Sequence, residues 1–168
     1  VTSQALPDGR VRVSASAGLG LGRLLARLRT MGLGGLEGLA GIPALLGGAV
    51  AMNAGAYGCD MGGVLARVRI WTPRDGLRWM DREELAFAYR EFSPGESGFF
   101  CITAAELDLE SRAPNEVRDE MRRHYRAKKR TQPVLARTCG CVFKNPASGP
   151  SAGELLDRCG YRGCFSGE

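Results

Sequence analysis

Three groups of residues in this chain have types and spacings that could do chemistry. The first is the segment 39–58, LAGIPALLGGAVAMNAGAYG, in which most residues are glycine or alanine. Glycine reaches positive φ and lets a backbone approach a ligand closely, and Pro43 fixes one turn. Small side chains leave backbone N–H groups unshielded, which suits a phosphate. A tightly packed turn-and-helix connection has the same composition, so glycine content alone leaves both interpretations open.

The other two groups are single reactive side chains in short motifs. Arg90 follows Tyr89, and a planar guanidinium can bind a carboxylate through two parallel hydrogen bonds while negative charge builds on it. Cys141 lies in the run 139–146, CGCVFKNP. A thiol with a pKa of about 8.5 is mostly protonated at neutral pH and can donate a proton. A small buried core residue is the alternative interpretation of Cys141.

The order of these residues resembles the UDP-N-acetylenolpyruvoylglucosamine reductase family, FAD enzymes of the vanillyl-alcohol-oxidase type. The resemblance rests on three runs in the glycine-rich segment, at 41–43, 47–49 and 52–58. It implies that this backbone lies against the pyrophosphate and flavin of FAD, with Asn53 offering an amide. Ala44 departs from the family, which usually has glycine there. The implied cofactor-binding residues are Gly41, Ile42, Pro43, Gly47, Gly48, Ala49, Asn53, Ala54, Gly55 and Tyr57.

The same resemblance implies roles for the reactive side chains. Arg90 matches the arginine that contacts the enolpyruvyl carboxylate, and Cys141 stands where the family motif Gly-Ser-X-Phe-Lys-Asn-Pro has its proton-donating serine. The second position after Arg90 is usually serine in the family but is Phe92 here. The implied catalytic residues are thus Arg90 and Cys141, and the implied substrate-binding residues are Tyr89, Arg130, Lys144 and Asn145.

The resemblance implies that NADPH reduces FAD, which then reduces UDP-N-acetylglucosamine enolpyruvate to the peptidoglycan precursor UDP-N-acetylmuramate. It covers the middle of a family member of the shorter, loop-lacking type, so we expect a further FAD-binding lobe before the chain and a glutamate that assists protonation after it. The chain is therefore expected to be a piece of a longer protein. Two alternatives stay open: a catalytically inactive or fragmentary domain that binds a nucleotide or flavin, and another FAD-dependent oxidoreductase of the same superfamily.

Composition narrows the class of protein. The 168 residues are 44% hydrophobic and 24% charged, which excludes a wholly disordered chain. A net charge of +5 favours anionic partners such as a UDP-sugar but is too small to indicate nucleic acid. No run of eighteen apolar residues predicts a membrane span. Six cysteines and one histidine form no zinc pattern, which indicates reduced thiols, no metal and a cytoplasmic protein. The oligomeric state is not predicted.

The elements that must position these residues follow from hydrophobic periodicity. Alternation predicts a strand at 10–16, a hairpin from 64–71 and 77–80, and a strand at 99–109. Leucines at helical spacing predict a helix at 20–30. Asp81 and Glu84 predict a capping box for a short helix at 82–86. The pattern is that of an α+β protein, and the resemblance implies the second lobe of an FAD-binding domain at 1–130, followed by the start of a substrate-binding domain at 131–168.

A second helix is predicted at 115–130, with Asn115 as its N-cap. Residues 111–130 contain eight arginines and lysines against three acidic residues. A solvated face is the favoured interpretation of this basic run, and an anion site that steers NADPH or a UDP-sugar is the alternative. His124 is expected to be a bystander on this surface.

Overall fold

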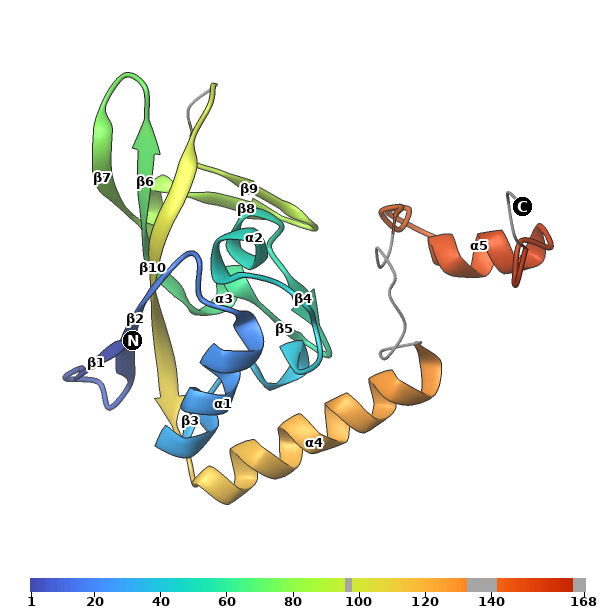
Figure 1. Ribbon diagram of the computed structural model, residues 1–168, viewed down its shortest axis with the longest axis horizontal. Helices are drawn as coiled ribbons and strands as arrows, with labels where there is room; N and C mark the ends of the chain where they lie inside the picture. Colours follow the sequence, from blue (N-terminus) through green and yellow to red (C-terminus); the bar gives the residue numbers. More distant parts are fainter. Residues whose placement is uncertain (96–97, 133–141, 165–168) are drawn as a thin grey trace. The chain divides into compact units, whose positions relative to one another are not determined.

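The computed structural model describes residues 1–95, 98–132 and 142–164 of the chain. The chain forms two compact units, Val1–Val134 and Leu135–Glu168 (Figure 1). Mixed helix and sheet content gives the α+β class that the sequence predicts. No helix among the described residues is long and apolar enough to cross a membrane.

The first unit is built on an antiparallel sheet of six strands. Its main path runs β1-β2-β10-β6-β7, and β3 pairs with one end of β10. The long strand β10 therefore lies in the middle, although it is the last of these strands in the sequence (Figure 1). The strands are β1 (Thr2–Ala5), β2 (Val11–Ser16), β3 (Leu33–Gly34), β6 (Leu65–Thr72), β7 (Gly76–Asp81) and β10 (Cys101–Ser111).

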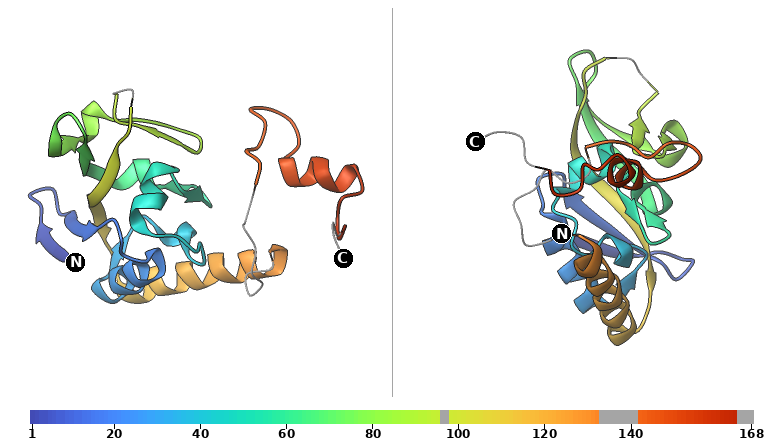
Figure 2. Two further views of the ribbon diagram at one scale, coloured as in Figure 1. Left: turned by 45° about the horizontal axis from the view of Figure 1, so that its top comes forward. Right: turned by 90° about the vertical axis from the view of Figure 1, so that its right-hand side faces the viewer.

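The hydrophobic core lies between the sheet and the helices on one of its faces (Figure 2). Successive side chains of a strand point to opposite faces. Val13 of β2, Val68 of β6 and Leu107 of β10 are fully buried on the core side. Helix α1 (Leu21–Met31) turns four leucines onto this core at the helical spacing that the sequence predicts, and Gly32 ends the helix in the left-handed conformation. The four leucines are Leu21, Leu24, Leu25 and Leu28.

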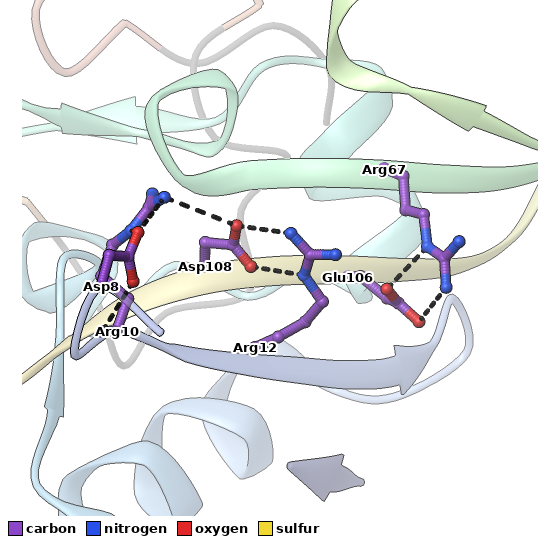
Figure 3. Close-up of polar contacts among 6 residues, drawn as sticks. All are labelled: Asp8, Arg10, Arg12, Arg67, Glu106 and Asp108. Carbon is purple, nitrogen blue, oxygen red and sulfur yellow. Dashed lines mark hydrogen bonds and ion pairs between the residues drawn. The ribbon is translucent and has the colours of Figure 1, made fainter. Parts of the chain in front are cut away.

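The opposite face of the sheet carries a ladder of ion pairs, which Figure 3 shows. Arg12 donates to both carboxylate oxygens of Asp108, each at 2.7 Å. Arg67 donates to both oxygens of Glu106, at 2.7 and 3.2 Å. Bidentate charged pairs of this kind fix register as well as adding energy. They tie β2 and β6 to the central strand on the face that the helices leave open.

The three predicted helices of this unit differ from the prediction at their ends, and α1, predicted at 20–30, is shifted by one residue to Leu21–Met31. Helix α4 (Pro114–Thr131) begins one residue early, and its N-cap is Ala113 rather than Asn115. Pro114 explains this, because its fixed φ suits the first helical position and it has no N–H to satisfy. The predicted helix at 82–86 is a single 3₁₀ turn, η2 (Arg82–Glu84), because the chain becomes extended at Leu85. The predicted capping box between Asp81 and Glu84 is confirmed.

The remaining elements of the first unit are short. They are η1 (Glu37–Leu39), α2 (Leu46–Ala51), β4 (Gly55–Ala56), β5 (Cys59–Asp60), α3 (Met61–Val64), β8 (Ala86–Ala88) and β9 (Glu91–Ser93). β4 pairs with β5, and β8 pairs with β9. In the second unit the described residues include one helix, α5 (Ala152–Arg158), whose N-cap Ser151 accepts a hydrogen bond from the N–H of Glu154.

Candidate cofactor-binding site

The glycine-rich segment is anchored at its centre to the turn before α1. The N–H of Leu46 donates to the carbonyl of Leu19 at 2.8 Å, and the N–H of Gly47 donates to the carbonyl of Ala17 at 2.9 Å. A Cβ on Gly47 would lie 2.8 Å from that of Ala17, so packing requires this glycine. Ala49 is buried. Gly48 is different, because it is exposed and a Cβ there would meet no atom within 4 Å.

Backbone strain is concentrated at the end of this segment. Among the described residues, the non-glycine positions with positive φ are Asn53 at 37°, Tyr57 at 53° and Arg90 at 56°. Asn53 and Arg90 are hydrogen-bonded to each other, and Tyr57 lies in the turn between β4 and β5. Left-handed conformations of such residues persist only where the surroundings enforce them, and they cluster at functional sites. The geometry therefore indicates a site here independently of the glycine count.

The side chain of Asn53 joins three separate segments. Its Nδ2 donates to the carbonyl of Ala88 at 3.1 Å, and its Oδ1 accepts from the N–H of Gly62 at 2.9 Å. Asn53 is buried, so these bonds are shielded from water. Its amide thus shapes the site by holding the glycine-rich segment, α3 and the β8–β9 hairpin together.

Arg90 sits in the tight turn between β8 and β9 and reaches back to the same segment. Its Nη1 donates to the carbonyl of Asn53 at 3.3 Å and its Nη2 to the carbonyl of Gly55 at 2.9 Å. The guanidinium lies 5.0 Å from the ring centroid of Tyr89, which is itself exposed. A guanidinium has five N–H donors. With two of them directed at these carbonyls, three are left for a ligand.

These residues line a concave pocket of about 640 Å³, which is within the usual range for a ligand site. Arg82 contributes a second cation, held by hydrogen bonds from its Nε to the carbonyl of Gly62 and from its Nη1 to that of Leu85. A Cβ on Gly62 would lie 2.9 Å from the ring of Phe87, so this wall must be backbone. The lining residues are Asn53, Gly55, Ala56, Gly58, Cys59, Asp60, Gly62, Gly63, Arg82, Phe87, Ala88, Tyr89 and Arg90.

The far side of the glycine-rich segment packs on α4. The ring of Tyr57 stacks on that of His124, with centroids 4.6 Å apart. A Cβ on Gly41 would lie 2.8 Å from the ring of Tyr125. His124 is therefore part of the support for the segment, which the prediction of a surface bystander did not foresee.

The predicted site residues fall into four groups. Asn53, Gly55, Tyr89 and Arg90 come together in the pocket, and Ala54 and Tyr57 lie in the same turn of the chain. Gly41, Ile42, Pro43, Gly47, Gly48 and Ala49 lie in the loop before α2 and in α2 itself. Arg130 is exposed near the end of α4, and Lys144 and Asn145 are exposed in the second unit. Cys141 lies outside the described residues.

Sequence reasoning missed Gly62, Arg82 and the role of α4. The pair Gly62-Gly63 is a signal that could have indicated close backbone approach. Arg82 carries no such signal, because the sequence predicts only a short capped helix at 82–86. In the second unit, Asn145 accepts a hydrogen bond from the N–H of Ala152 at 3.0 Å through its side-chain oxygen, so it also holds the start of α5.

Comparison with known proteins identifies relatives of this chain. Residues 4–80 match the family model described as FAD binding domain, and residues 132–168 match the C-terminal domain of UDP-N-acetylenolpyruvoylglucosamine reductase. The chain is 51% identical over 157 residues to UDP-N-acetylenolpyruvoylglucosamine reductase of Oleidesulfovibrio alaskensis, and 50% identical over 154 residues to that of Nitratidesulfovibrio vulgaris. These alignments cover 93% and 91% of this chain and 52% of each relative.

A solved structure is also similar. The crystal structure of UDP-N-acetylenolpyruvylglucosamine reductase (MurB) from Thermus caldophilus superposes with a TM-score of 0.77 and 37% sequence identity, covering 88% of this chain and 53% of that one. The chain thus spans about half the length of the relatives it matches.

Proposed function

Because the chain belongs to the UDP-N-acetylenolpyruvoylglucosamine reductase family, we propose that it is the central part of a flavoenzyme that reduces UDP-N-acetylglucosamine enolpyruvate to UDP-N-acetylmuramate. FAD is the proposed cofactor, NADPH the hydride donor and a UDP-sugar the substrate. The product is a precursor of peptidoglycan, and we place the reaction in the cytoplasm.

The observation that carries this proposal is the link between Arg90 and the glycine-rich segment. Arg90 uses two N–H groups to hold the carbonyls of Asn53 and Gly55. Its remaining donors can bind a carboxylate in the same pocket, so one side chain would fix the cofactor segment and the substrate together. Adding hydride to a carbon β to a carboxylate builds negative charge on that group, which a fixed guanidinium stabilises.

The residues of the site fit FAD. The pocket wall is backbone at Gly55 and Gly62, where a Cβ would collide with neighbouring atoms, and Arg82 and Arg90 supply positive charge beside it. Gly48 leaves open space above α2 in which a ring or phosphate can approach the backbone. FAD, when bound, would supply hydride chemistry that no side chain of the chain has.

The remaining proposed steps belong to the chain's own residues. Arg90 would hold the enolpyruvyl carboxylate, and Tyr89, Arg130, Lys144 and Asn145 would bind the rest of the UDP-sugar. Cys141 would deliver a proton from its Sγ to the carbon that neighbours the site of hydride addition. A thiol is a stronger acid than the serine hydroxyl of the family motif, so it can serve as the general acid.

Anaerobic flavin spectroscopy on the chain tests this proposal. The chain is mixed with FAD, reduced with NADPH until the visible absorbance bleaches, and then given UDP-N-acetylglucosamine enolpyruvate. We expect the substrate to restore the absorbance. Cys141→Ala should bleach normally but recover slowly, whereas Cys101→Ala, a control at the exposed start of β10, should behave as the wild type.

Two results would overturn parts of the proposal separately. If FAD shows no spectral shift with the chain, the described site does not hold the cofactor by itself. If the wild type recovers with substrate and Cys141→Ala recovers at the same rate, the thiol is not the proton donor.

A further inference from the structure

Lys128 is a buried cation in the last turn of the basic helix α4, whose other buried residues, Val117 and Met121, are apolar. Its side chain is only 5% exposed, while its neighbours Lys129 and Arg130 are exposed. Burial lowers the pKa of Lys128. Lysine is almost never buried unless its ammonium group is well partnered, so the position calls for a reason.

The partners of Lys128 lie in the glycine-rich segment 39–58 or directly before it. Its Nζ donates to the carbonyl of Ala40 at 2.9 Å and to that of Gly38 at 3.3 Å. The same Nζ lies 5.6 Å from the ring centroid of Tyr57, close enough for a cation–π interaction. One side chain of α4 therefore holds both ends of the segment, although about 90 residues separate it from Gly38.

These hydrogen bonds also orient the peptide that follows. In a trans peptide the C=O and the next N–H point in opposite directions. A carbonyl of Ala40 turned toward Lys128 thus turns the N–H of Gly41 away from α4. Gly41 is exposed and has a φ of 84°, which favours glycine at the start of the loop before α2.

A second set of polar contacts joins the chain before Gly38 to α4. Arg112, just before α4, bonds to Glu37 and to Glu120, each at 2.9 Å. Glu37 is buried and accepts the N–H of Gly35 at 2.8 Å. This attachment fixes the chain before Gly38, so Lys128 has only the short stretch 38–41 left to hold.

We infer that Lys128 is a positioning residue for the cofactor: its buried ammonium holds the stretch 38–41 and the ring of Tyr57 in the conformation that binds FAD. The inference rests on the proposed function, to which it adds a residue that lies outside both family-model matches. Lys128 does not touch the cofactor itself. It acts through the carbonyls of Gly38 and Ala40.

Amide hydrogen exchange and flavin titration on the chain test this inference together. The N–H groups of Leu39, Ala40 and Ile42 donate to the carbonyls of Leu36, Glu37 and Leu39, and their exchange reports the order of the stretch. Lys128→Met keeps the length of the side chain and removes its donors. We expect exchange of these amides to rise about tenfold, as for the loss of about one hydrogen bond, while exchange in β10 changes less than about twofold.

FAD affinity is measured on the same samples by quenching of flavin fluorescence. We expect Lys128→Met to weaken FAD binding about tenfold, Lys128→Arg to restore most of it, and the control Lys129→Met to leave it unchanged. Lys129 is the matched control because it is the adjacent, exposed lysine.

Each outcome decides a separate point. Unchanged exchange of Leu39, Ala40 and Ile42 in Lys128→Met overturns the inference, and so does faster exchange with unchanged FAD affinity. A wild-type chain that binds no FAD shows that the described site does not hold the cofactor by itself, and the exchange result then decides alone whether Lys128 positions the stretch. Thermal unfolding of each variant separates a local effect from loss of the fold.

Discussion

Substituting alanine for Gly48 should separate the stability of the fold from the binding of FAD. Gly48 lies in α2, its φ is not positive, and a Cβ there would meet nothing within 4 Å. Alanine in a helix is favoured over glycine by about 0.5–1 kcal/mol, because less backbone entropy is lost on folding. For a chain of this size that corresponds to a rise in Tm of about 1–4 °C.

The same methyl group should weaken FAD binding if the cofactor approaches the backbone at Gly48. Forcing a methyl group into a close contact costs about 1–3 kcal/mol. This corresponds to a dissociation constant about 5- to 150-fold higher, since each 1.4 kcal/mol is about tenfold. The variant should therefore be more stable than the wild type and yet bind FAD less tightly.

Gly22→Ala is the matched control. Gly22 is an exposed glycine of α1 whose Cβ would also meet nothing within 4 Å. Gly22→Ala should gain similar stability and bind FAD normally. Differential scanning calorimetry and flavin titration measure the two quantities. Equal FAD affinity in both variants would refute the placement of the cofactor at Gly48. A lower Tm in Gly48→Ala would refute the conclusion that the added methyl group meets no atom of the chain.

Three further outcomes are expected. Gly38→Ala should lower the free energy of unfolding by about 1–3 kcal/mol, because its Cβ would collide with a backbone carbonyl oxygen of β4; an unchanged urea midpoint would contradict this. The hydrogen bond from Arg112 lowers the pKa of Glu120, so the stability it contributes is present above about pH 4.3 and lost as the pH falls through the lowered pKa. The Tm difference between wild type and Glu120→Gln should shrink on acidification, and a constant difference would exclude the pair. Burial raises the pKa of the Cys59 thiol, so iodoacetamide at pH 7 should label Cys59 more slowly than the exposed Cys101, as peptide mass spectrometry would show; equal rates would argue against burial.

Much of the framework could be predicted from the sequence because its signals are local. The leucine spacing of α1 and the alternation in β2, β6 and β10 each follow from the few residues concerned. The capping box of Asp81 and Glu84 is another local signal, and the structure confirms it. In each case the side chains that determine the element lie within it.

The site was less predictable because its contacts join distant segments. Arg90 was predicted as a ligand for a carboxylate. Its left-handed φ and its hydrogen bonds to Asn53 and Gly55 depend on a segment that lies at least 35 residues away in the sequence. Lys128 was hidden in a basic run that favours a solvated face, and only packing against Gly38 and Ala40 buries it. Strands of two residues, such as β4 and β5, are likewise defined by pairing rather than by sequence pattern.

The central place of β10 has a consequence for how the chain acquires its fold during synthesis. β2 and β6 each pair with β10, and both strands emerge from the ribosome before residues 101–111 do. Until then both strands keep unpaired edges, which are prone to wrong pairing and aggregation. Arg12 and Arg67 lack their partner carboxylates until Asp108 and Glu106 are made, because they pair with these residues in the folded chain. Repulsion between like charges would keep the nascent strands apart until the strand that carries the matching carboxylates is made.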